Sequence, residues 1–208
     1  MKKLILALAC MLTLGATIAQ EKGKFGMEIN NGRSLFTNYS ALSLFQDETA
    51  VSTCNLAEIN LFYATKNNFT WTLSLFGNRG NTSNIALNET YGIHGLVLGF
   101  RRSAMVSEKS ELYFGMGVGM AVVNNDFDGY SVNRLGLKTN WGLGYNYYVT
   151  SNTYIGASIN YSTIGCFSAM GGLSIPDMPL GADMTNYSLN QKTDVQGLNF
   201  QIGLGIKF

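Results

Sequence analysis

Strict alternation of large apolar residues with polar or small residues dominates this chain. In the last segment, Asp194–Phe208, apolar side chains occupy every second position from Leu198 onward, and glycine, amides and a lysine fill the positions between them. A period of two is typical of a β-strand whose two faces meet different surroundings. The segments with this period are Lys24–Asn31, Cys54–Thr65, Phe69–Gly77, Tyr91–Arg102, Ser110–Val123, Asn133–Val149, Thr153–Ile164 and Asp194–Phe208. We therefore expect an all-β protein of eight strands.

The connections between these segments alternate in length. The short ones lie near 66–68, 104–109 and 151–152, and the long ones are 32–53, 78–90, 124–132 and 165–193. Strands joined in sequence by hairpins form an up-and-down antiparallel sheet, which can close into a barrel. With an even number of strands, both ends of the chain lie at the end that carries the short turns.

The composition indicates which face of the barrel is inside. Only 13% of the residues are charged, about half the usual share for a soluble domain, and 24 are glycine. Glycine and small polar residues fill one face, and they suit the crowded interior of an eight-stranded barrel. The other face carries large apolar residues, which would form too large an exposed patch in water. The sequence therefore predicts a transmembrane barrel with its apolar face toward lipid. A soluble secreted barrel that binds a hydrophobic ligand is the alternative.

The N-terminus predicts an export signal. Lys2 and Lys3 precede an apolar stretch over 4–18, and Ala19 provides a small residue for cleavage. We expect a signal peptide over 1–19 and one barrel domain over 20–208. A lipoprotein signal at Cys10 is the alternative. No other apolar run approaches the roughly 18 residues of a membrane-spanning helix.

Taken together, these features resemble the small eight-stranded outer-membrane β-barrel proteins of Gram-negative bacteria, the porin-like OmpX and OmpA barrels. The resemblance implies a place in the cell outer membrane, contact with its lipid and insertion by the barrel-insertion machinery. The alternating residues that resemble the C-terminal insertion signal are Phe200, Ile202, Leu204, Ile206 and Phe208. The cleavage region and the high Asn content are similar to secretory proteins of Bacteroidetes.

The resemblance implies a structural, adhesive or surface-interaction role, with the loops 32–53 and 165–193 available for a surface ligand. A narrow porin-like channel for small solutes is the alternative, and a lipid-modifying enzyme is less favoured. His94 is the only histidine, and no local motif gives it a catalytic partner, so we expect no enzyme, metal or cofactor. The net charge of +1 argues against nucleic-acid binding.

Charges on the small, polar face are the candidate functional residues of the bore. Glu28, Glu58, Arg101 and Lys138 all fall on this face, as does Lys207. Because a charge in a narrow bore is unfavourable unless paired, we predict ion pairs Glu28–Arg101 and Glu58–Lys138 that plug the barrel. Solvation by trapped water is the alternative.

Two further groups of residues lead to expectations about the barrel ends. Cys54 and Cys166 lie near the loop-bearing end, either as free thiols or as a disulfide. Aromatic residues are expected to form girdles at the membrane interfaces. Those residues are Trp71, Trp141, Tyr63, Tyr91, Tyr145, Tyr147 and Tyr154.

Overall fold

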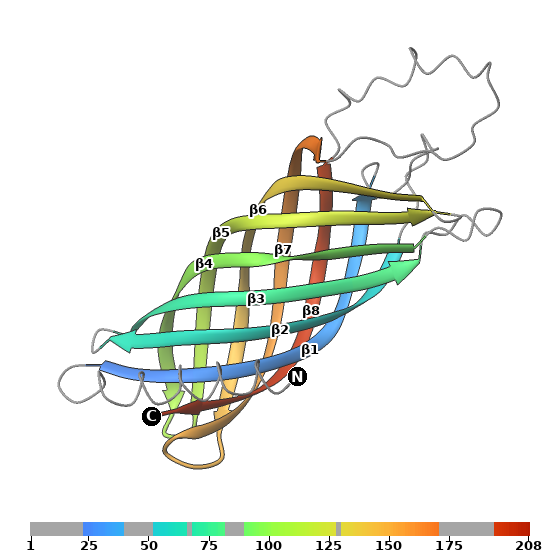
Figure 1. Ribbon diagram of the computed structural model, residues 1–208. Coiled ribbons are helices and arrows are strands. Elements are labelled where there is room, and N and C mark those ends of the chain that lie inside the picture. Colours follow the sequence, from blue (N-terminus) through green and yellow to red (C-terminus); the bar gives the residue numbers. More distant parts are fainter. Residues whose placement is uncertain (1–22, 40–51, 66–67, 82–89, 128–129, 171–193) are drawn as a thin grey trace, which may run out of the picture.

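The computed structural model describes residues 23–39, 52–65, 68–81, 90–127, 130–170 and 194–208, and they form a closed antiparallel barrel (Figure 1). Each strand pairs with its neighbours in sequence, and the last strand pairs with the first. The strands are β1 (Gly23–Tyr39), β2 (Ser52–Thr65), β3 (Phe69–Asn81), β4 (Thr90–Ser107), β5 (Ser110–Phe127), β6 (Tyr130–Tyr148), β7 (Thr153–Met170) and β8 (Asp194–Lys207). The predicted eight-stranded up-and-down barrel is confirmed.

Several strands are longer than the alternation predicts. β1 continues to Tyr39 and β7 to Met170, so the first part of each predicted long loop, 32–53 and 165–193, is strand. Backbone pairing continues there, as between Phe36 and Ser52, although the regular alternation of apolar residues has ended. The remaining connections, 40–51 and 171–193, lie outside the described residues, as does the predicted signal peptide. None of the described residues belongs to a helix that could cross a membrane.

The strands are strongly inclined to the barrel axis, as Figure 1 shows. Starting at Met27, the row of paired residues passes once around the barrel and returns to β1 at Asn38, eleven residues farther along. A bulge between Phe36 and Asn38 takes up part of this stagger. β1 begins and β8 ends at the same end of the barrel, which we call the terminal end. The opposite end is the loop end.

The outside of the barrel carries the predicted apolar face. Leu143 is 65% exposed and Ile202 is 68% exposed, although both are large aliphatic side chains. Exposed leucine, isoleucine, valine, methionine and aromatic side chains occur on every strand from β3 to β8, and β1 contributes Ile29. Such a surface is stable only against an apolar medium.

The inside of the barrel is packed by aromatic rings that lie over glycines of the neighbouring strand. Tyr154 on β7 covers its register partner Gly205 on β8, and Tyr113 on β5 covers its partner Gly144 on β6. A Cβ atom on either glycine would overlap the ring. Glycine is therefore required here to give the rings room in a narrow bore.

Candidate functional site

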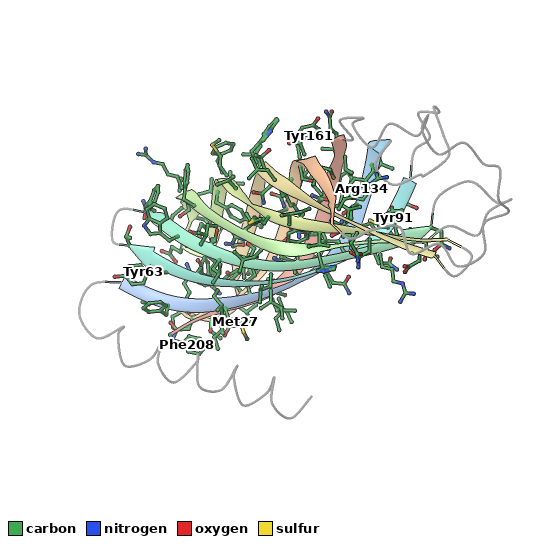
Figure 2. All side chains as sticks on the ribbon, turned by 45° about the horizontal axis from the view of Figure 1, so that its top comes forward. Met27, Tyr63, Tyr91, Arg134, Tyr161 and Phe208 are labelled. Carbon is green, nitrogen blue, oxygen red and sulfur yellow. The ribbon has the colours of Figure 1, made fainter. Side chains whose placement is uncertain are left out.

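The loop half of the bore is filled by an apolar cluster, which we call the apolar plug. Its residues come from seven of the eight strands and are all buried. They are Phe36, Cys54, Leu56, Phe76, Tyr91, Ile93, Val97, Ala121, Val123, Ile164 and Val195. Side chains fill the interior in Figure 2, in which Tyr91 lies toward the loop end and Phe208 toward the terminal end. The plug resembles the core of a soluble protein, because large buried side chains pack against one another there.

The middle of the bore is crossed by an ion pair. Arg101 donates two hydrogen bonds to Glu28, with Nη1–Oε2 at 2.8 Å and Nη2–Oε1 at 3.2 Å. The Glu28 carboxylate also accepts hydrogen bonds from Tyr154 Oη at 2.7 Å, Asn30 Nδ2 at 2.6 Å and Asn60 Nδ2 at 3.2 Å. Because Glu28 is only 2% exposed, these donors replace the water that the carboxylate would otherwise bind. The arrangement locks β1, β2, β4 and β7 together across the bore.

The other predicted pair does not form. Lys138 places its Nζ 3.3 Å from the ring centroid of Phe76, and no oxygen of Glu58 lies within 4 Å of it among the described residues. Glu58 instead accepts a hydrogen bond of 2.6 Å from Gln201 Nε2. Phe76 is the register partner of Glu58 on the inner wall, so its ring lies where the ammonium crosses the bore. The prediction of a Glu58–Lys138 ion pair is therefore wrong, although Glu58 remains within electrostatic range.

A second polar cluster closes the terminal end. Glu111 accepts hydrogen bonds from Tyr148 and from Asn146 Nδ2, the latter at 3.2 Å, and its Oε2 lies 3.6 Å from Lys207 Nζ. Lys207 also donates to the Tyr148 hydroxyl. Glu111 and Tyr148 are not among the residues predicted for the bore. Both could have been found by alternation, since Glu111 stands two residues before Tyr113, and Tyr148 two residues after Asn146.

A small cavity with a volume of about 30 Å³ lies between Val97 of the apolar plug and Arg101 of the central ion pair. Its polar lining includes Glu58, Ser74, Arg101, Asn140 and Gln201. This volume is enough for one or two water molecules and too small for a solute. Water in this cavity would satisfy the amide oxygen of Asn140, which accepts no hydrogen bond from the described residues.

The remaining candidate residues divide between the two surfaces of the wall. His94 is exposed on the outside, where its register partners are Gly77 and Val122, so no carboxylate or nucleophile faces it from the neighbouring strands. Cys54 and Cys166 are not joined by a disulfide, and Cys166 packs against the apolar plug that contains Cys54.

The predicted aromatic girdles are partly wrong. Tyr91 and Tyr154 point into the bore and are each 1% exposed, because alternation places them with the inner face of β4 and β7. Trp71, Trp141, Tyr145 and Tyr147 are exposed on the outside as expected, and Tyr63 is half-buried. The five aromatic and aliphatic residues of the predicted insertion signal, Phe200, Ile202, Leu204, Ile206 and Phe208, are also exposed on the outside.

Comparison of the sequence with models of known protein families finds no match, and comparison with curated proteins finds none either. Solved structures do match. Neisserial surface protein A aligns with a TM-score of 0.63 and 12% identity over 90% of this chain and 100% of that one. The chain has the fold of a small outer-membrane β-barrel.

Two further structures support the same fold. A major outer membrane protein from Thermus thermophilus has a TM-score of 0.59 and 11% identity, and it covers 90% of this chain and 100% of its own. Ail, the attachment invasion locus protein of Yersinia pestis, has a TM-score of 0.50 and 15% identity at the same coverages. At these identities the similarity concerns the architecture.

Proposed function

We propose that this protein is an integral barrel of the cell outer membrane with a closed bore, and that it acts at the cell surface in a structural or adhesive role. The observation that carries the proposal is the apolar plug. Eleven buried side chains fill the loop half of the bore, and the cavity below them is of water size. A hydrophobic constriction of this kind excludes ions and polar solutes.

The outer surface supports the membrane part of the proposal. Large apolar side chains stay exposed along the strands, while the charged side chains of Glu28, Arg101 and Lys138 turn inward. In water, this inverted arrangement would expose far more apolar surface than a soluble monomer tolerates. The predicted export signal over 1–19 is consistent with delivery beyond the inner membrane.

The end of β8 supports recognition during assembly. Phe200, Ile202, Leu204, Ile206 and Phe208 present one apolar ridge on the outside of the last strand. The barrel-insertion machinery would recognise an alternating apolar ridge of this kind that ends in an aromatic residue. We include this role, and contact with outer-membrane lipid, in the proposal.

The loop end is the part of the molecule that would meet external partners. Four connections leave the barrel there, and 40–51 and 171–193 are the longest of them. Because the closed bore offers no passage, a ligand would have to bind these segments. Loops carried on a rigid scaffold are common binding sites.

Conductance measurements on the refolded protein in planar bilayers test the closed bore. We expect no steady conductance from the wild type. We expect steady openings from Phe36→Ala/Tyr91→Ala, which removes two rings of the plug. Leu143→Ala is the matched control, since it truncates a large side chain on the outside. A large steady conductance of the wild type would overturn the closed bore in favour of the narrow porin-like channel.

Fractionation of cells that express the full chain tests the membrane location. We expect the protein in outer membranes, with migration on SDS gels that changes on heating, as a folded membrane barrel resists the detergent. Recovery as a soluble monomer would instead support the secreted ligand-binding barrel.

A further inference from the structure

A patch of polar residues interrupts the apolar outer surface on the loop half of β1–β4. Arg33, Asn55 and Arg79 are register partners in one row across β1, β2 and β3, and all three are exposed. In the next outward-facing row toward the terminal end, two residues away, Asn31 on β1 and His94 on β4 are exposed as well. We call these five residues the outer basic patch. They belong to neither the plug nor the polar clusters of the bore.

On the neighbouring strands, the apolar outer surface extends farther toward the loop end than the patch does. The row of His94 continues to Val122 on β5 and Leu135 on β6, which are apolar. Because each row rises toward the loop end from β1 to β8, Val122 and Leu135 stand farther toward that end than His94. The apolar surface therefore extends farther toward the loop end on β5 and β6 than on β1–β4. The arginines therefore lie at a height at which the other side of the barrel still carries outward apolar side chains.

The charge of the patch has no counter-charge on the same surface. The outward positions of β1–β4 that the structure describes carry no Asp or Glu, and Glu28 and Glu58 both turn into the bore. None of the ion pairs formed by the described residues involves Arg33 or Arg79. Intramembrane arginine is unfavourable without a partner or a polar phase within reach.

Two glycines form an open floor within the patch. Gly77 is the register partner of His94, and Gly92 is that of Arg79. A Cβ atom on Gly77 would meet nothing within 4 Å, and one on Gly92 would meet only the Asn78 carbonyl oxygen at 3.9 Å. The glycines of the bore, by contrast, lie against rings or backbone of the protein. Packing within the protein therefore does not account for Gly77 and Gly92, which leave bare backbone between the basic side chains.

We propose that the outer basic patch binds the phosphate headgroup of an outer-leaflet lipid, with the acyl chains lying along Leu75, Leu96 and Leu98 below it. Arg33 and Arg79 stand two strands apart, about 10 Å between backbones, so both guanidinium groups can reach one headgroup. Guanidinium forms paired hydrogen bonds with phosphate oxygens, and His94 adds a further donor. The three leucines are exposed and continue the apolar surface directly from the floor. This inference depends on the proposed membrane location.

Native mass spectrometry of the refolded full chain in non-ionic detergent tests the site. The probes are dioleoyl phosphatidic acid, which presents a phosphate monoester, and dioleoyl phosphatidylcholine, which has the same chains and a shielded phosphate. We expect one phosphatidic acid per barrel to bind saturably and at least tenfold more tightly than phosphatidylcholine. Arg33→Gln/Arg79→Gln should weaken that binding at least tenfold.

Arg102→Gln is the matched control, because Arg102 is an exposed, outward-facing arginine on β4 near the terminal end. We expect it to change the affinity less than twofold. Gly77→Val, which fills the floor, should weaken phosphatidic acid binding about fivefold while the heat-modifiable migration stays that of the wild type.

Three results would overturn the site. They are equal binding of the two lipids, wild-type affinity in the double arginine variant, and an equal loss in Arg102→Gln. A protein that shows no heat-modifiable form and does not float with vesicles of phosphatidylcholine would overturn the membrane location itself. If the protein floats with the vesicles but binds phosphatidic acid no more tightly than phosphatidylcholine, only the proposed lipid site is overturned.

Discussion

Arg101 and Glu28 meet in the middle of the bore through two hydrogen bonds, although 73 residues separate them in the chain. One lies on β4 and the other on β1, so their contact crosses the barrel and does not follow its wall. Tyr154 on β7 completes the arrangement from a third direction. The pair therefore acts as an internal brace that resists flattening of the barrel.

Removing one member of this brace should destabilise the barrel strongly. Glu28→Gln leaves Arg101 charged in a buried site, and breaking a buried pair in this way costs about 3 to 5 kcal/mol. We expect this loss in the free energy of unfolding, measured by urea denaturation of the protein in phosphatidylcholine vesicles. The double variant Glu28→Gln/Arg101→Met removes the stranded charge and should recover most of the loss. Equal losses in the single and double variants would contradict the role of the ion pair.

The inward glycines should be sensitive to substitution where an aromatic ring covers them. Gly205→Val places side-chain atoms in the space of the Tyr154 ring, and we expect little folded protein on refolding. Gly77→Val is the control, because the space beside Gly77 is open and valine favours strands. The fraction of heat-modifiable barrel after refolding measures both. Normal refolding of Gly205→Val would show that the ring can move aside.

Alternation alone accounts for much of this molecule. It places Glu28, Arg101 and Lys138 on the inner wall, and the narrowness of an eight-stranded bore then brings opposite charges together. It does not determine which inner neighbour a long side chain meets, so the contact of Lys138 with Phe76 was missed. Alternation also puts Tyr154 on the inner face of β7, because it stands two residues before the inward-facing Gly156. The prediction of an outward Tyr154 rested instead on the general preference of tyrosine for membrane interfaces.

The ends of the strands were the least predictable part. Toward the loop end, polar residues such as Arg33 take the place of apolar ones on the outside of β1, so the alternation fades while backbone pairing continues. Ser34 and Phe36 face inward in this extended part of β1, and Asn78 on β3 donates a hydrogen bond of 2.7 Å to Ser34. The hydrophobic pattern carries no signal for such a contact, which depends on register between strands.

Cys54 should resist thiol reagents in the folded barrel. Its side chain is buried in the apolar plug, and its sulfur accepts a long hydrogen bond of 3.6 Å from Asn78 Nδ2. In the variant Cys166→Ala, we expect maleimide labelling of Cys54 only after unfolding in hot SDS. The reciprocal variant Cys54→Ala should label faster, since Cys166 is less buried. Rapid labelling of Cys54 in the folded state would mean that the plug opens.

Lys138 should be replaceable by an apolar residue without loss of stability. It is 6% exposed, and its ammonium is stabilised by the face of Phe76 without a carboxylate within 4 Å. The attraction of a cation to a ring is about 1 to 2 kcal/mol, which is less than the several kcal/mol needed to bury an unpaired charge. We therefore expect Lys138→Met to leave the free energy of unfolding in vesicles unchanged or raised. The change in the free energy of unfolding can be compared directly with that of Glu28→Gln, since each variant removes one charge from the same bore. A loss as large as that of Glu28→Gln would mean that Lys138 neutralises Glu58 across the bore after all.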